Sequence, residues 1–199
     1  MIVLHYTAMD GAEAAVERLC DPEAEVSAHY LICARGDIIR LVDEEMRAWH
    51  AGAGRWGDVE DVNSRSIGIE LDNLGTHPFS EPQMAALEGL MRGIMARWSI
   101  PPERVIGHQD MAPERKFDPG PRFDWQRLAR AGLSVWPEGG DGDPARFRAD
   151  AARFGYRAEV SEEAVLKAFR ARFRPWAAGG LDAQDAGLAR TLANKYSAK

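Results

Sequence analysis

Apolar and polar positions alternate along the first 136 residues in a pattern that predicts interleaved strands and helices. Short runs rich in β-branched and other apolar residues are expected to form strands at residues 2–6, 29–33, 38–42, 66–71 and 104–108. The second and third runs are separated by ARGD, in which Gly36 marks a hairpin turn. Strands interleaved with helices are typical of an α/β fold with a mixed central β-sheet flanked by helices.

Helical spacing of apolar residues predicts the flanking helices. Asp10 and Glu13 have the spacing of a capping box, and the apolar positions after them indicate a first helix. Ser80 begins a longer helix whose apolar stripe, over residues 84–98, is interpreted as a core face. A closing helix is expected within residues 123–133.

A break in composition follows this closing helix. The segment PEGGDGDP, residues 137–144, combines glycine, proline and acidic residues without periodicity and is interpreted as a linker. Three short helical patterns lie beyond it, each with a capping residue at its start: Asp143, Ser161 and Asp182. The sequence therefore predicts a sheet domain over residues 1–136 and a small three-helix C-terminal domain over residues 145–199.

Composition and charge exclude several classes of function. With 45% hydrophobic and 28% charged residues, the 199-residue chain has the composition of a soluble globular protein. A formal net charge of -6 provides no overall positive field, so no binding to nucleic acid or to an anionic membrane surface is expected. Cys20 and Cys33 are too few for a disulfide framework and are interpreted as two partly buried thiols.

The N-terminal residues, MIVLHYTAM, have neither the basic segment nor the cleavage site of a secretory signal. No apolar run approaches the ~20 residues that span a membrane, so no membrane insertion is expected. These features predict a cytoplasmic protein. Because Met1 stands directly before the first predicted strand, a start further upstream is the alternative, and it would allow a periplasmic protein.

Candidate chemistry gathers in GHQDMAPERKFDPGP, residues 107–121. Proline and glycine restrict or permit particular backbone angles, so the residues after Asp118 are expected to hold it at a defined position. His5 and His108 stand at the ends of predicted strands, where α/β proteins commonly build sites. Two imidazoles and a carboxylate are the ligands of a catalytic zinc ion, Zn2+, with one position open to water. The spacing alone also fits hydrogen-bonded structural histidines, because no local motif joins His5 to His108.

Two further residues have chemistry that suits such a site. Glu70 lies among apolar residues in the run 66–71, so its pKa is expected to be raised, as suits a general base. The alternative for Glu70 is an exposed glutamate at a sheet edge. Lys116 stands two residues before Asp118 and could stabilise an oxyanion, although the residues alone favour a solvated loop lysine.

Five blocks of sequence together resemble one enzyme family. They are HYTA, VSAHYLI, RAWHAG, SIGIEL and GHQDMAPERKFDPGPRFDW, and they occur in this order between residues 5 and 125. They resemble the zinc-dependent N-acetylmuramoyl-L-alanine amidases of the AmpD and AmiD type, which are related to the peptidoglycan-recognition proteins. The resemblance covers residues 1 to about 136.

The resemblance implies roles for the matching residues. It implies three zinc ligands: His5, His108 and Asp118. Glu70 matches the acid that activates the water, and Lys116 matches the basic residue near the tetrahedral intermediate. Arg115 and Trp49 look like substrate-binding positions. Two other histidines in these blocks are interpreted as structural or supporting residues: His29 and His50.

The substrate that the resemblance implies is a muropeptide or peptidoglycan, cleaved at the amide between N-acetylmuramic acid and L-alanine. A cytoplasmic enzyme would act on 1,6-anhydro-muropeptides in cell-wall recycling, and a periplasmic one on intact peptidoglycan. Residues 145–199 resemble a three-helix peptidoglycan-binding domain whose usual core motif is degraded, so a packing role is the alternative. Two further alternatives are a non-catalytic peptidoglycan-binding protein and a zinc hydrolase of a different amide.

Overall fold

The structure, a computed structural model that describes residues 1–196, contains a five-stranded sheet with the order β3-β2-β4-β1-β5. The strands are β1 (Ile2–Tyr6), β2 (Tyr30–Ile32), β3 (Ile38–Arg40), β4 (Ile67–Leu71) and β5 (Val105–Gly107). β2 and β3 form an antiparallel hairpin, whereas β2, β4, β1 and β5 run parallel to one another. The predicted mixed central sheet and its hairpin are therefore confirmed.

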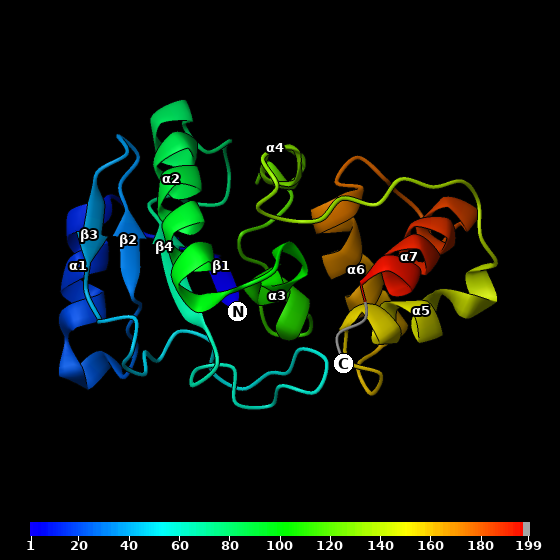
Figure 1. The fold of residues 1–199 in the computed structure, drawn as a ribbon, viewed down its shortest axis with the longest axis horizontal. Helices are drawn as coiled ribbons and strands as arrows, with labels where there is room; N and C mark the ends of the chain where they lie inside the picture. The colour runs from blue at the N-terminus through cyan, green and yellow to red at the C-terminus, as the bar shows by residue number, and fades with distance from the viewer. Residues whose placement is uncertain (197–199) are drawn as a thin grey trace.

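Seven helices accompany the sheet in the described residues. They are α1 (Ala12–Cys20), α2 (Glu81–Trp98), α3 (His108–Met111), α4 (Trp125–Arg130), α5 (Phe147–Phe154), α6 (Glu162–Phe173) and α7 (Ala183–Lys195). Short 3-10 turns lie at Pro22–Ala24, Pro102–Arg104 and Pro144–Arg146. In Figure 1 the sheet lies beside α1 and α2 on the left, and α5, α6 and α7 form a separate group on the right. The helices α3 and α4 lie between these two groups. No helix within residues 1–196 has the length and apolar character needed to cross a membrane.

α2 packs on one face of the sheet, and the side chains of the candidate site lie on the opposite face. The side chain of Ser80 caps α2 by accepting a hydrogen bond from the backbone N–H of Gln83, as predicted. Side chains of α2 share a buried hydrophobic cluster with alternate residues of β1 and β4, among them Ile2, Leu4 and Ile69. Because successive side chains of a strand point to opposite faces, the residues between them face away from α2.

Several local predictions are wrong. The strands predicted at residues 29–33 and 38–42 are shorter, at Tyr30–Ile32 and Ile38–Arg40. Asp10 and Glu13 do not cap α1, because Gly11, with φ of 94°, turns the chain so that the helix begins at Ala12 without a side-chain cap. Cys20 is exposed rather than partly buried, because only Ala15 of this short surface helix is buried. The fifth strand ends at Gly107, one residue earlier than predicted, because His108 already begins α3.

The C-terminal helices share a hydrophobic core with the sheet domain. The three predicted capping residues all accept a backbone hydrogen bond at a helix start: Asp143, Ser161 and Asp182. A single buried cluster includes Val3 and Trp56 on one side of the predicted boundary and Phe154 and Phe169 on the other. The ring of Trp56 lies edge-on to that of Phe154, with centroids 5.3 Å apart. The boundary at residue 136 stays a prediction, but the helices pack as part of one core.

The segment predicted as a linker lies against α7. Residues 137–143 form neither helix nor strand. The N–H of Gly142 donates to the carbonyl of Ala183 at 2.7 Å, and a Cβ atom on Gly187 would overlap the carbonyl oxygen of Gly140. Only glycine at position 187 allows the two backbones to approach so closely. This connection is therefore packed onto the C-terminal helices.

Candidate metal centre

Strand register brings Glu70, His5 and His108 together at the C-terminal ends of three neighbouring parallel strands. β1 lies between β4 and β5, and its pairing sets His5 opposite Glu70 and Leu4 opposite Gly107. Paired residues of adjacent strands point to the same face, so Glu70 lies beside His5 on the face away from α2. His108 follows Gly107, the last residue of β5, directly and so lies at the same end of the strands.

Asp118 reaches the two histidines from the loop after α3. The backbone N–H of Gln109 donates to the carbonyl of Asp118 at 2.9 Å, which ties this loop to the start of α3. Oδ2 of Asp118 lies 3.0 Å from Nδ1 of His5 and 3.1 Å from Nδ1 of His108. The two Nδ1 atoms are 2.9 Å apart. The three predicted ligands thus present one donor atom each to a common point.

The second nitrogen of each ligand histidine has an orienting partner. Nε2 of His5 lies 3.0 Å from Nδ1 of His50, and Nε2 of His108 lies 2.9 Å from the carbonyl oxygen of Ala51. Such partners fix the orientation of metal-binding imidazoles and leave the opposite nitrogen free for the ion. Within residues 1–196, the ring nitrogens of His29 hydrogen-bond only to backbone atoms, the N–H of Gly68 and the carbonyl oxygen of Met46.

Electrostatics at the cluster suit a cation. Burial, together with the nearby His108, lowers the pKa of His5 to about 4, so its imidazole is neutral near pH 7. Burial alone would raise the pKa of Asp118, but its contacts with His108 and His5 outweigh burial and hold that pKa well below its usual range. A neutral imidazole and an ionised carboxylate are the states that metal ligation requires.

The donor set fits zinc. Zinc ligands at 2.0–2.1 Å in tetrahedral geometry lie about 3.3 Å from one another, close to the 2.9–3.1 Å separations found here. Two histidines and one carboxylate leave the fourth position for water, as in catalytic rather than structural zinc sites. The residues His5, His108 and Asp118 therefore match the chemistry of this ion.

Glu70 is half-buried beside this cluster and is not the exposed edge residue of the alternative interpretation. β4 lies inside the sheet between β2 and β1. Oε2 of Glu70 is buried and has no hydrogen-bond partner among residues 1–196. Burial, with a smaller contribution from the negative charge of Asp118, raises the pKa of Glu70 to about 8, while Lys116 opposes this shift. A carboxyl group with a pKa near neutrality can both accept and donate a proton.

The other predicted residues border the cluster in different ways. Lys116 is half-buried and close enough to affect the pKa values of both His5 and Glu70. Arg115 donates to the carbonyl oxygens of Ala51, at 2.9 Å, and Ala53, so its guanidinium holds this loop. Trp49 is 55% exposed, with the guanidinium of Arg47 stacked 4.1 Å from its ring centroid. Substrate contacts for Arg115 and Trp49 stay predictions.

Comparison with known proteins decides the family. Residues 1–121 match the family model described as N-acetylmuramoyl-L-alanine amidase. The chain belongs to this amidase family. The N-acetylmuramoyl-L-alanine amidase AmiD of Escherichia coli is 36% identical, over 98% of this chain and 83% of that protein. The 1,6-anhydro-N-acetylmuramyl-L-alanine amidase AmpD of Enterobacter cloacae is 40% identical, over 52% of this chain and 55% of that protein.

Solved structures agree with the amidase assignment over nearly the whole chain. The Escherichia coli AmiD complex with anhydro-N-acetylmuramic acid-L-Ala-D-gamma-Glu-L-Lys superposes with a TM-score of 0.90 at 36% identity, covering 98% of this chain and 89% of that one. AmpDh3 of Pseudomonas aeruginosa in complex with an anhydromuramic pentapeptide gives 0.87 at 34% identity, covering 100% and 92%. The amidase fold and the C-terminal helices are thus both shared with these structures.

Sequence reasoning missed a buried network that supports His108 in this amidase. Asp110 is fully buried and accepts from the N–H of Gly107, at 2.8 Å, at the start of α3. Its carboxylate also accepts from the hydroxyl of Tyr156 at 2.8 Å and from Nη1 of Arg172 at 2.7 Å. Both partners come from the C-terminal helical region. The only sequence signal was Asp110 itself, three residues after Gly107 in GHQD, whereas its partners lie 46 and 62 residues away.

Breaking this network is expected to destabilise the whole amidase. Arg172→Met leaves the Asp110 carboxylate buried without its cation, which typically costs about 3–5 kcal/mol of the free energy of unfolding. Urea denaturation measures the loss. The matched control is Arg40→Met, which removes an exposed ion pair with Asp43 and should have a much smaller effect. Equal effects of the two substitutions would contradict the supporting role of Arg172.

Gly68 is expected to be needed for the position of His50. A Cβ atom at residue 68 would come within 2.6 Å of Nδ1 of His50, the atom that faces His5. We expect Gly68→Ala to lower zinc affinity about 10- to 100-fold, as loss of an outer partner of a metal ligand does. Competition with a chelator measures this affinity. Gly89→Ala is the control, because a Cβ atom at residue 89 meets no neighbour within 4 Å in the described part of the chain, and it should leave the affinity unchanged.

Proposed function

We propose that this amidase uses zinc held by His5, His108 and Asp118 to hydrolyse the amide between N-acetylmuramic acid, in its 1,6-anhydro form, and L-alanine. The physiological role of this reaction would be the recycling of peptidoglycan. The observation that carries the proposal is the convergence of the three donor atoms, within 3.1 Å of one another, beside the half-buried side chain of Glu70. The anhydro-muropeptides bound by AmiD and AmpDh3 support the choice of substrate.

Zinc at this site would supply Lewis acidity and lower the pKa of a bound water to roughly 7. Glu70 is the proton carrier in this proposal. Its carboxylate accepts a proton from the attacking water and then donates it to the departing L-alanine nitrogen, so that no proton is lost. The half-buried position of Glu70 and its raised pKa suit both steps.

Lys116 stabilises the oxyanion that develops on the reacting carbonyl. Its positive charge lies close enough to His5 and Glu70 to lower the pKa values of both groups. A single well-placed donor at an oxyanion is typically worth about 3 kcal/mol in the transition state. Asp118 lies two residues further on, so one loop supplies both a ligand and this charge.

Product analysis tests the reaction and the substrate together. Zinc-loaded protein is incubated with anhydro-N-acetylmuramic acid-L-Ala-D-gamma-Glu-L-Lys and, separately, with intact peptidoglycan, and the products are identified by mass spectrometry. We expect release of the free tripeptide from the first substrate. Elemental analysis of the native protein should find about one zinc per chain. Zinc content without cleavage of either substrate would contradict the proposal, and absence of zinc would favour a non-catalytic binding protein.

The second candidate is an amidase of intact peptidoglycan. The match to AmiD extends through the C-terminal helices, over 98% of the chain, whereas the match to AmpD covers 52%. Fractionation of the native organism tests the compartment. Recovery in the cytoplasm supports the recycling of anhydro-muropeptides, and recovery in the periplasm with faster cleavage of intact peptidoglycan supports the alternative.

A further inference from the structure

The short helix α3 determines the position of two of the three candidate zinc ligands. His108 is its first residue, and the backbone N–H of Gln109, its second, donates to the carbonyl of Asp118 at 2.9 Å. The loop that carries Asp118 also packs onto the end of β5, because a Cβ atom on Gly107 would lie 2.7 Å from Cδ of Pro119. The position of α3 therefore decides where two ligands lie relative to the third, which belongs to β1.

A buried carboxylate anchors α3. The helix has only four residues, too few for a helix that is stable by itself. Its third residue, Asp110, accepts from the N–H of Gly107 directly before the helix. The other donors are the hydroxyl of Tyr156, 2.8 Å from Oδ1, and Nη1 of Arg172, 2.7 Å from Oδ2. Each oxygen of this carboxylate is thus held from the C-terminal helical region.

Arg172 connects α6 to the start of β5 as well as to α3. Its Nη2 donates to the carbonyl of Val105, the first residue of β5, at 2.9 Å, while its Nη1 binds Asp110. The guanidinium also lies over the ring of Trp125 on α4, 4.4 Å from the ring centroid. The side chain of Arg172 is fully buried, and its planar fork reaches both partners at once. This arginine therefore sets the spacing between α6, β5 and α3.

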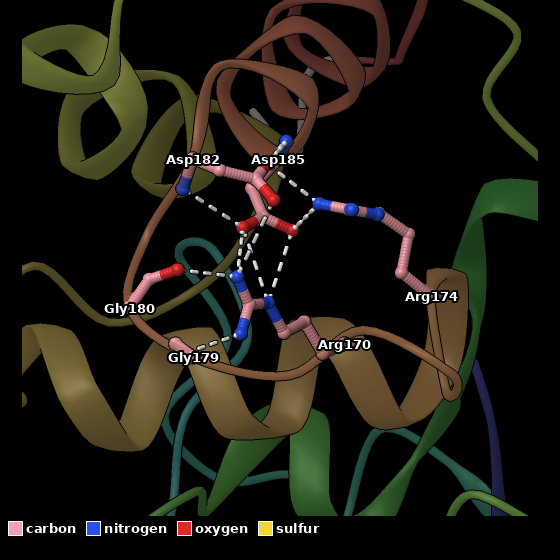
Figure 2. Close-up of polar contacts among 6 residues, drawn as sticks. All are labelled: Arg170, Arg174, Gly179, Gly180, Asp182 and Asp185. Carbon is pink, nitrogen blue, oxygen red and sulfur yellow. Dashed lines mark hydrogen bonds and ion pairs between the residues drawn. The ribbon is translucent and has the colours of Figure 1, made fainter.

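Two other arginines fix α6 from its opposite side (Figure 2). Arg170 and Arg174 are four residues apart and lie on one side of the helix, whereas Arg172 between them points the other way. Both bind the fully buried carboxylate of Asp185 on α7, Arg170 through Nη2 and Arg174 through Nη1, each at 2.6 Å. α6 is therefore held between α7 on one side and α3 with β5 on the other.

We propose that Tyr156 and Arg172 are positioning residues for zinc binding. Acting through Asp110, they hold α3 where the two ligands that depend on it converge with the ligand on β1. Metal ligands must lie within about 0.2 Å of their ideal distances, so a small displacement of α3 weakens the site. The inference rests on the proposed function, in which these ligands hold zinc. It gives the C-terminal helices a part in the reaction that requires no contact with the substrate.

Tyr156→Phe tests this role, because it removes one hydroxyl and leaves the ring in the hydrophobic core. We expect zinc affinity, measured by competition with a chelator, to fall about three- to tenfold. Loss of a partner that contacts a ligand directly typically costs about 10- to 100-fold, and Tyr156 acts one step further away, through Asp110. The matched control is Tyr30→Phe, which removes a hydroxyl that donates to Glu44 at 2.7 Å, and it should leave the affinity unaltered.

Cobalt(II) at the same ligands provides a readout that a loss of stability alone does not move. The visible absorption of Co2+ depends on the geometry of its ligands. At saturating Co2+, the spectrum of folded Tyr156→Phe should differ from that of the unsubstituted protein, and the spectrum of Tyr30→Phe should not. Arg172→Lys keeps a charge beside Asp110 but lacks the fork that also reaches Val105, so it should alter the spectrum as well.

Amide hydrogen exchange in the metal-free protein separates this inference from the proposed function. The N–H of Gln109 is bonded to Asp118, and its exchange should be about three- to tenfold faster in Tyr156→Phe and unaltered in Tyr30→Phe. Unaltered zinc affinity, cobalt spectrum and exchange in Tyr156→Phe overturn the inference while the proposed function stands. An equal loss of zinc affinity in Tyr30→Phe assigns the effect to overall stability and also overturns it. If the unsubstituted protein binds no zinc but exchange at Gln109 rises as expected, the proposed function fails and the coupling of α3 to the C-terminal helices stands.

Discussion

Replacing Glu70 with glutamine is expected to lower kcat by about 10²- to 10⁴-fold while zinc remains bound. Glutamine keeps the size and the hydrogen-bonding shape of the side chain but cannot accept a proton from the attacking water. Because Glu70 lies beside the ligand cluster and contributes no ligand atom to it, the ion should be retained. Steady-state kinetics on the anhydro-muropeptide and elemental analysis of the same sample measure both quantities.

The control for Glu70 is Glu17→Gln, an exposed position on α1, which should leave kcat unaltered. A Glu70→Gln protein with a rate close to that of the unsubstituted protein would remove Glu70 from the reaction. A variant that has lost zinc as well as activity would instead make Glu70 a residue of the metal site. The two results are distinguished by the metal content alone.

Asp118→Ala is expected to abolish tight zinc binding and, with it, activity. Loss of an outer partner of a ligand typically costs 10- to 100-fold in affinity, so removal of a ligand should cost more than about 100-fold. The substitution also removes the only carboxylate that contacts both His5 and His108 within residues 1–196. Chelator competition measures the affinity, and activity should return only at high zinc concentration.

Asp124→Ala is the control for Asp118. Asp124 follows in the same loop but caps α4 instead, by accepting from the N–H of Arg127 at 2.9 Å. Its loss should lower stability without altering zinc affinity. Similar zinc affinities for Asp118→Ala and the unsubstituted protein would show that the ion is held elsewhere.

Local patterns along the chain were sufficient for the sheet and for most helices, whereas the residues of the candidate metal centre were predicted through the resemblance to a family. Period-two runs predict strands because one strand face packs against α2, and helical spacing predicts α2 because its stripe fills the same core. Capping at Ser80, Ser161 and Asp182 was predictable because the cap contacts a residue only three positions away. The resemblance to the amidases assigned roles to His5, Glu70 and His108, which lie on separate strands or at their ends.

Contacts between distant residues were decided only by the tertiary structure. The cap predicted at Asp10 does not form, because the positive φ angle of Gly11, not a side chain, determines where α1 begins. Neither the pairing of Asp110 with Arg172 nor the approach of Gln109 to α6 leaves a periodic trace, since each joins segments more than 50 residues apart. The sequence by itself therefore determined which side chains offer the imidazole and carboxylate groups of the candidate metal centre. Only the packing of the C-terminal helices against the sheet decided how His108 is supported and what surrounds the site, because burial and ion pairing depend on which distant segments meet.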